Sequence, residues 1–222
     1  MQRLASLHKR IKRIEYQADI DRFSKTIKKE FGLEREQVEK LAPLIAKFKS
    51  SSVTPGNKQE ILEKIMEIVK NDETLLVGLT YYSAMNEEWE LAIKYARAFL
   101  EVKGRESAGF LSIGLLEPCI LNYIGRKDEA MKKLEVFSSQ IKDQWYQHIA
   151  KCLLGEETEK SLVQRAGESP EYLITAQCAL GFWAEGAGKN EKALKHYKEA
   201  LGSYMDEWFE YEFTMERIKK LR

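Results

Sequence analysis

The chain has 222 residues, of which 44% are apolar and 32% are charged, and its formal net charge is +1. This composition excludes a disordered chain, which would contain fewer apolar residues, and it lacks the strongly basic character that recruits nucleic acid. Only four prolines occur, and good helix formers fill the long stretches between them. The composition therefore favours an all-α fold.

Residues 1–30 are predicted to form one long amphipathic helix, because their apolar residues recur at three- and four-residue steps. The first fourteen residues also carry five basic side chains and no acidic one. This pattern predicts a contact surface made of Leu4, Leu7, Lys9, Arg10, Ile11, Lys12, Arg13 and Ile14. Such a helix could dock on the rest of the chain, pair with a second copy or lie on an anionic membrane.

Two shorter helices are predicted next, over residues 34–48 and from Asn57 to Val69. The stretch SSSVTPGN, residues 50–57, separates them as a loop, and Asn57 with Glu60 resembles a capping box. We therefore divide the chain into an N-terminal helical segment, residues 1–71, and a second domain, residues 72–222. The first segment is either a divergent helix pair or a separate cap.

From residue 72 onward, helical patterns alternate with short turns. Glycines at 125, 155 and 188 mark three of these turns, and small residues recur in the helix that follows each turn. The corresponding positions 92, 130, 160 and 193 are separated by 38, 30 and 33 residues, with Lys160 in place of the expected alanine. This spacing is typical of repeated helix pairs.

The clearest pair spans residues 172–201, and Ser169-Pro170 before it provides an N-cap serine and a proline at the first helical position. Its key positions are Gly181, Gly188, Ala193, Tyr197 and Ala200. These five match the small residue, turn glycine, alanine, aromatic residue and second alanine of a tetratricopeptide repeat, which this unit resembles. In the pair before residue 140, Pro118 replaces the small residue. The resemblance implies a right-handed α-solenoid of antiparallel helix pairs.

The segment DEWFEYEFTMERIKKLR after the last pair is predicted to form a C-terminal capping helix. The residues expected to cover the last pair recur at three- and four-residue spacing, and they are Trp208, Tyr211, Met215, Ile218 and Leu221. The opposite, polar side is expected to face water, as in the terminal helices of solenoids.

No catalytic or cofactor-binding arrangement is evident. The sequence GAGK, residues 186–189, lacks the first glycine and the hydroxyl residue of a phosphate-binding loop. The three cysteines form no CxxC pair and are expected to be buried, reduced thiols. The three histidines are scattered without metal-ligand spacing, and His196 is expected at the surface. We therefore predict no catalytic residues, no metal, no cofactor and no enzymatic activity.

The resemblance implies that ligands bind the inner face, which the first helix of each pair lines. The positions expected there are Val77, Tyr81, Leu115, Cys119, Asn122, Trp145, Ile149, Cys178, Phe182 and Glu185. Basic residues are missing from this set, which argues against a clamp for the C-terminal carboxylate of chaperones. Three interpretations stay open: the face receives a partner's helix or apolar peptide, the chain's own N-terminal helix closes it, or these side chains are core.

We therefore expect a non-catalytic, cytoplasmic protein–protein interaction scaffold that binds a partner peptide or helix in an apolar groove, with Trp145, Tyr81 and Phe182 as anchors. The alternative is a self-associating or membrane-peripheral assembly factor that acts through the basic N-terminal helix. The most apolar window, residues 110–124, is interrupted by Glu117 and Pro118, so no transmembrane segment is expected. A cytoplasmic chain of this type could also be the soluble part of a larger, membrane-associated protein.

Overall fold

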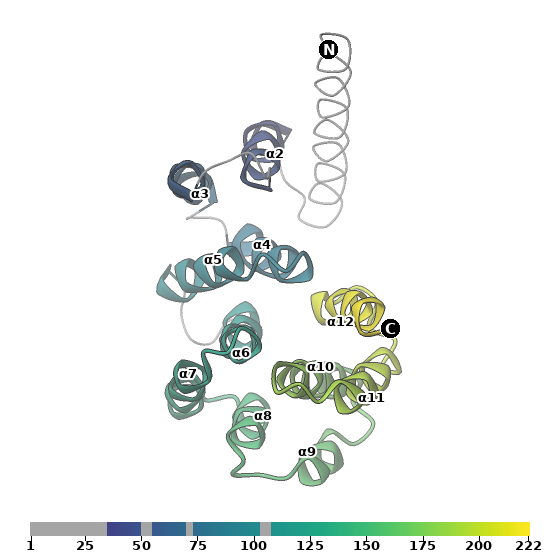
Figure 1. The fold of residues 1–222 in the computed structure, drawn as a ribbon. Coiled ribbons are helices and arrows are strands. Elements are labelled where there is room, and N and C mark those ends of the chain that lie inside the picture. Colours follow the sequence, from purple (N-terminus) through teal and green to yellow (C-terminus); the bar gives the residue numbers. More distant parts are fainter. Residues whose placement is uncertain (1–34, 50–54, 70–72, 103–107) are drawn as a thin grey trace. The chain divides into compact units, whose positions relative to one another are not determined.

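A computed structural model describes residues 35–49, 55–69, 73–102 and 108–222 (Figure 1). Every regular element within these ranges is an α-helix, which confirms the all-α class. The chain divides into two compact units, Met1–Leu75 and Leu76–Arg222, and each is described by itself. The long helix predicted over residues 1–30, with its contact residues from Leu4 to Ile14, lies outside the described residues.

The described part of the first unit contains two helices, α2 (Arg35–Lys49) and α3 (Pro55–Val69), which pack against each other. Their buried side chains are Leu41, Ala42 and Ile45 on α2 and Ile61, Leu62 and Ile65 on α3. The prediction of a capping box at Asn57 is wrong, because α3 begins at Pro55 and Asn57 therefore lies inside the helix. Proline suits the first helical position, since the N–H that it lacks would have no partner inside the helix.

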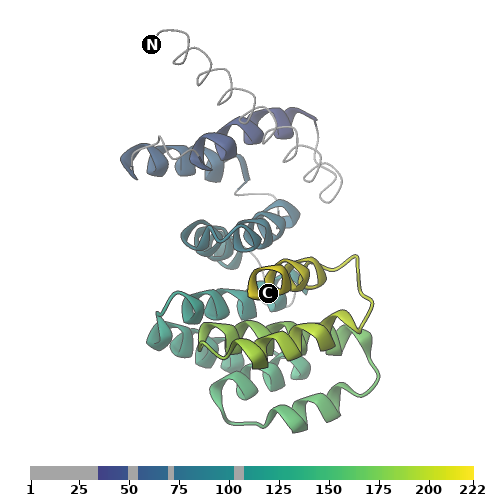
Figure 2. The same ribbon diagram turned by 45° about the vertical axis from the view of Figure 1, so that its right-hand side comes forward.

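The second unit continues through nine consecutive helices of the described chain. They are α4 (Glu73–Met85), α5 (Trp89–Val102), α6 (Ala108–Tyr123), α7 (Lys127–Gln140), α8 (Gln144–Leu154), α9 (Glu159–Ala166), α10 (Pro170–Gly186), α11 (Asn190–Leu201) and α12 (Phe209–Leu221). Tight turns join α4 to α5, α6 to α7 and α10 to α11. The closest packing is between α10 and α11, which lie side by side in Figures 1 and 2.

The turns between paired helices share one backbone feature. Gly125, Gly155 and Gly188 have φ angles of 82°, 83° and 71°, in the left-handed region that glycine adopts without steric cost. Each lies five residues before one of the equivalent positions 130, 160 and 193. Glu87 lies five residues before Ala92 and also has a positive φ, of 62°. A glutamate therefore occupies the turn position that glycine holds in the other three pairs.

Close helix packing depends on a glycine in two of the pairs. A Cβ atom added to Gly181 would lie 2.6 Å from the ring of Tyr197, and one added to Gly114 would lie 2.2 Å from the ring of Phe137. Gly114 precedes Pro118, the residue at the expected small position, by four residues, which is about one helical turn. The close contact between α6 and α7 therefore lies about one helical turn farther from the connecting loop than the equivalent contact between α10 and α11.

The first helices of the pairs are not stacked in chain order. Helix α6 packs directly against α10, although the pair formed by α8 and α9 lies between them in the sequence. Asn122 of α6 donates a 3.0 Å hydrogen bond to the carbonyl of Trp183 of α10. A Cβ atom on Gly186 would lie 2.9 Å from the backbone of Tyr123, so this crossing also depends on glycine. Helices α6 and α10 thus contact each other at their C-terminal turns.

His196 on α11 is buried, so the prediction of a surface position is wrong. Its Nδ1 lies 2.7 Å from Oε1 of Gln177 on α10, and its ring is 6% exposed. Burial is the largest influence on its pKa and lowers it. The periodicity of α11 does not show whether this residue is buried or exposed. Imidazole is polar, but it can be buried between helices when a neighbouring side chain forms a hydrogen bond with it.

Gly181→Ala should destabilise the protein even though alanine is intrinsically better than glycine in a helix by about 1 kcal/mol. The added methyl group meets the ring of Tyr197, which is fully buried and held by a 2.8 Å hydrogen bond to Glu185. We expect a loss of about 1–3 kcal/mol, as for other overpacked core positions. Urea unfolding followed by circular dichroism measures it, and an increase in stability would contradict the contact.

Candidate functional site

The residues predicted to line the inner face are all buried within the second unit. They come from α4, α6, α8 and α10, as expected, and the most exposed of them retains 9% of its accessible surface. The face is not an open groove in this structure. The C-terminal helix α12 covers the part of it that includes Tyr81, Phe182 and Glu185. The N-terminal helix predicted as a possible cover lies outside the described residues.

The predicted residues contribute to different local structures. Tyr81, Phe182 and Glu185 contact α12. Leu115, Cys119 and Cys178 line a small cavity beside it, whereas Asn122 lines a separate, polar cavity. Val77 and Ile149 are buried in the helix packing.

Trp145 is buried between α8 and α10 and is not a surface anchor. Its indole N–H donates a 2.9 Å hydrogen bond to the hydroxyl of Thr175, and its ring stacks on Tyr172 with centroids 4.5 Å apart. Thr175 in turn donates to the carbonyl of Glu171. In this position Trp145 stabilises the packing of α8 on α10, and its ring is 7% exposed.

The buried face of α12 is not the predicted one. Of the five residues expected to cover the last pair only Ile218 is buried, and Met215 is 37% exposed. The buried residues are instead Glu210, Phe213, Thr214, Arg217 and Ile218. The helix is rotated because the surface that receives it offers carboxylates and hydroxyl groups as well as aromatic rings. We call that surface the α12 seat and define it by Tyr81, Glu87, Trp89, Tyr123, Phe182 and Glu185.

Arg217 fastens the C-terminal half of α12 to the seat, and only 1% of it is exposed. Its guanidinium binds the Glu185 carboxylate through two nitrogens, with Nε donating to Oε2 at 3.1 Å and Nη2 donating to Oε1. Nη1 donates to Oε1 of Glu87 at 2.8 Å, and Nη2 also donates to the Tyr123 hydroxyl at 3.1 Å. Planar, bidentate pairing of this kind is specific to arginine among the basic residues.

Three aromatic rings surround the same guanidinium. The Cζ atom of Arg217 lies 5.0 Å from the ring centroid of Tyr123, 5.5 Å from that of Trp89 and 5.9 Å from that of Phe182. These distances are within the range of cation–π attraction. Burial alone would lower the pKa of Arg217, but its hydrogen bonds to Glu185 and the charge of that carboxylate outweigh burial and raise the pKa. The side chain therefore stays cationic in the core.

Glu87 gains a partner from its unusual turn conformation. Besides Arg217, it lies 3.2 Å from the ammonium group of Lys220, which also donates to the carbonyl of Met85 at 3.0 Å. A residue other than glycine in the left-handed region costs about 1–2 kcal/mol. Burial raises the pKa of Glu87, but hydrogen bonds from Arg217 and Lys220 outweigh this and lower it. The strained turn thus places a carboxylate where two cations of α12 can bind it.

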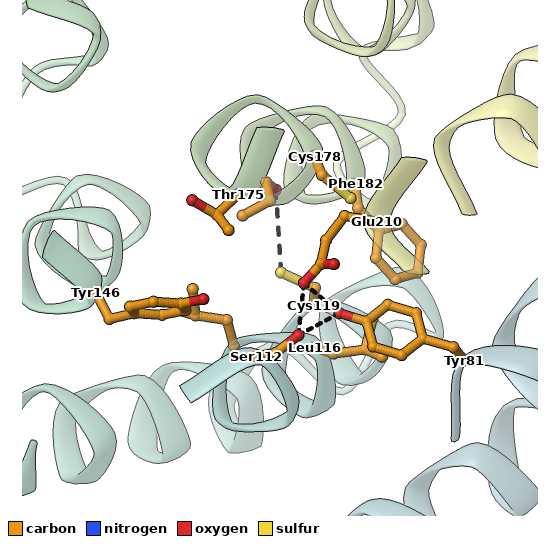
Figure 3. A pocket seen from close by; sticks show the side chains of 11 residues that line it. Tyr81, Ser112, Leu116, Cys119, Tyr146, Thr175, Cys178, Phe182 and Glu210 are labelled. Atoms are coloured by element: carbon orange, nitrogen blue, oxygen red, sulfur yellow. Dashed lines mark hydrogen bonds between the residues drawn. The ribbon is translucent and has the colours of Figure 1, made fainter. Parts of the chain in front are cut away.

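The N-terminal half of α12 is held by a second polar group (Figure 3). Tyr81 of α4 and Ser112 of α6 both donate to Oε1 of Glu210, at 2.8 and 2.6 Å. The Tyr81 and Ser112 oxygens are themselves 2.5 Å apart. Next to this group, the Tyr81 ring stacks on Phe209 with centroids 5.2 Å apart, and Phe213 meets Phe182 edge-on at 4.8 Å. Two clusters therefore hold α12 at its two ends.

Cys119 and Cys178 lie beside the Glu210 cluster, and all three cysteines of the described chain are buried and free, as the sequence predicts. Burial raises the pKa of Cys119 to about 12, and burial together with the charge of Glu210 raises that of Cys178. Thiols in this state are protonated near neutral pH and are poor nucleophiles. They form an apolar wall of the cavity.

Within the described ranges, no group of three or more His, Cys, Asp or Glu side chains is arranged to hold a metal ion. Within the same ranges, none of the helices combines the length and the apolar character needed to cross a membrane. Neither models of known protein families nor curated protein sequences gave a match to this chain.

Sequence reasoning missed Glu210, Ser112 and Arg217, the polar residues that hold α12. A usable signal was present, since Glu210, Thr214 and Arg217 recur at four- and three-residue spacing and so share one helix face. Polar residues in that pattern are usually assigned to the solvent side, because charged side chains are almost never fully buried unless they are paired. Their partners lie on α4, α6 and α10 and are far away in the sequence.

Arg217→Met should detach α12, because it leaves the Glu185 carboxylate buried without its cation, a change that costs about 3–5 kcal/mol. Hydrogen exchange measured by mass spectrometry should show at least a hundredfold loss of protection in residues 209–221, with α7 unaffected. Lys219→Met is the matched control, because the side chain of Lys219 is 66% exposed on the same helix. Equal protection in the two variants would show that Arg217 does not hold α12.

Acid should weaken the seat through Glu87. In the folded chain, the pKa of Glu87 is below its ordinary value of 4.5. Its contribution to stability is therefore fully present above about pH 4.5 and is lost as the pH falls through the lowered pKa. We expect the melting temperature to fall less between about pH 5 and pH 3 in Glu87→Gln than in the native chain. Glu135→Gln, at an exposed site on α7, should retain the native pH dependence. Identical curves for all three proteins would contradict this role of Glu87.

Proposed function

We propose that this protein is a non-catalytic interaction scaffold that binds an amphipathic helix of a partner protein in the α12 seat. The observation that carries the proposal is that the seat already holds a helix, through a guanidinium cage at one end and aromatic rings at the other. Helix-in-groove recognition uses anchors at three- and four-residue spacing. In the isolated chain, α12 occupies the surface that a partner helix would take.

The architecture that we propose is a right-handed α-solenoid of divergent pairs resembling tetratricopeptide repeats. Four features support it: positive φ angles at the turn glycines, the buried alanines at 92, 130 and 193, the contact of Gly181 with Tyr197, and the order of the paired helices. The direct packing of α6 on α10 departs from a regular stack. The seat beside α6 and α10 holds one helix, α12, which favours a helical ligand over an extended one.

The seat defines the partner by its chemistry. The partner helix would carry an arginine in the position of Arg217 and aromatic residues one and two turns before it, in the positions of Phe213 and Phe209. Arginine is required because the Glu185 carboxylate is contacted by two nitrogens and three rings lie around the guanidinium. Lysine offers neither the bidentate fork nor the planar stacking surface.

The chain's own α12 is the natural test ligand. A fluorescently labelled peptide of residues 207–222 should bind the Arg217→Met protein at least tenfold more tightly than it binds the Lys219→Met protein. In the native chain and in the control, the tethered helix competes at an effective concentration in the millimolar range. In Arg217→Met that competition is weakened, whereas the peptide retains its arginine. Fluorescence anisotropy measures the difference.

The control ligand is the same peptide with Arg217→Met, which should bind none of these proteins. The proposal fails if hydrogen exchange shows α12 detached and the remaining helices folded, and the native peptide still does not bind. It also fails if both peptides bind equally, because the seat would then lack the selectivity for arginine that the Glu185 fork implies.

A further inference from the structure

Three glutamates of the described chain are buried, and they differ in their partners. Glu117 lies 2.8 Å from Nε of Arg97 and 3.2 Å from Nζ of Lys133. Glu185 is paired with Arg217. Glu210, which is 9% exposed, forms no ion pair with any described residue. A buried carboxylate is costly unless a cation or several hydrogen bonds compensate its charge. Glu210 therefore differs from the other two glutamates because no cation of the described chain lies beside it.

The two hydrogen bonds that Glu210 receives leave one of its oxygens available. Tyr81 and Ser112 both donate to Oε1, and no described residue donates a hydrogen bond to Oε2. In Figure 3 the carboxylate points into the cavity between α6 and α10, with Tyr146 on the side opposite Tyr81. Tyr146 also lines this cavity, and Figure 3 shows its hydroxyl oxygen on the side that faces Glu210. Since Tyr81 and Ser112 have already donated their protons, the polar groups offer mainly acceptors to a ligand.

The cavity walls favour a cation over a neutral donor. The rings of Tyr81, Tyr146 and Phe182 line it, and aromatic faces attract a positive charge. The other lining residues are aliphatic, carry protonated thiols or, in Thr175, have a hydroxyl that already donates to a backbone carbonyl, so none of them provides a competing anion. A negative charge on Glu210 surrounded by rings and acceptors is complementary to a positively charged hydrogen-bond donor.

The size of the cavity selects the ligand class. The centre of a water-sized group can move within about 30 Å³ of it, and one such group needs roughly 10–15 Å³ by this measure. The space therefore accommodates two such groups, for example a nitrogen and the carbon attached to it. A planar guanidinium with its three nitrogens, or a quaternary ammonium, needs more space than this enclosed part offers.

We propose that this cavity binds a primary ammonium group, R–NH₃⁺, with Glu210 as its counter-ion. The three ammonium protons have acceptors in Oε2 of Glu210, the Tyr146 hydroxyl and the Ser112 hydroxyl. The R group leaves the cavity on the side of Tyr146 and Ser112, which are partly exposed. The ligand is either a small alkylamine or a lysine side chain of a polypeptide. Helix capture in the seat requires α12 to leave, whereas this site exists only while α12 is docked, so the two proposals can fail separately.

Titration with methylammonium chloride at constant ionic strength tests the site on the full chain. Amide chemical shifts of residues 112 and 210 should move with a dissociation constant in the millimolar range, the range expected for so small a ligand. A second titration with N-acetyl-lysine-N-methylamide distinguishes the source of the amine. Its Nε-acetylated form has no charge and should not bind.

Glu210→Gln should weaken methylammonium binding at least tenfold, because it keeps the shape of the side chain and removes the charge. Glu212→Gln is the matched control, since it removes the same charge from the same turn of α12 and lies outside the residues that line the cavity. If Glu210→Gln detaches α12 in hydrogen exchange, Ala179→Val replaces it, because Ala179 lines the cavity without contributing a hydrogen bond to Glu210, and the added methyl groups fill the space for the ammonium group. Arg217→Met should also lose this binding.

Binding of either amine that depends on Glu210, or on the cavity space beside Ala179, supports the proposal. Binding of methylammonium alone assigns the site to a small amine, and binding of the lysine derivative assigns it to a polypeptide. The proposal is overturned if neither amine shifts these amides, or if the Glu210→Gln and Glu212→Gln proteins bind equally well.

Discussion

The buried pair between Arg217 and Glu185 is the interaction on which the arrangement of the second unit depends. A guanidinium in a protein core is tolerated only when its charge and its hydrogen-bond donors are satisfied, and here two carboxylates, one phenol and three rings do so. These groups come from the turn between α4 and α5 and from α5, α6 and α10. The C-terminal helix therefore contacts residues more than ninety positions earlier in the chain and closes the inner face that the first helices line.

The same pair explains two local features that would otherwise be unfavourable. Glu87 adopts a left-handed conformation at a turn where the other pairs have glycine, and its carboxylate binds both Arg217 and Lys220. Glu185 lies in the middle of the core, where it also accepts a hydrogen bond from Tyr197. Tyr197 in turn packs against Gly181. The glycine that permits close packing of α10 on α11 is thus connected, through two side chains, to the residue that holds α12.

The polar groups under α12 are not equivalent, and the difference has a functional meaning. Where Arg217 supplies a cation, the carboxylate and the helix that carries the arginine are fastened together. Where Glu210 faces a cavity lined by rings and acceptors, its charge has hydroxyl partners only. The two proposed sites exclude each other, because the ammonium site includes Glu210 of α12 and a partner helix in the seat would displace that helix.

The sequence by itself determined the local structure of this protein. Periodicity predicted the helices over residues 34–48 and 57–69 to within two residues, and Ser169-Pro170 predicted the start of α10. The predicted turn glycines at 125, 155 and 188 adopt the left-handed conformation that most other residues avoid. Only the tertiary structure decided which face of α12 is buried, why Glu87 replaces a turn glycine and how α6 comes to lie on α10. Burial of Arg217, Glu210 and His196 depends on partners far away in the chain, and a charged side chain in a helix has the same local preference whether water or a distant carboxylate will surround it.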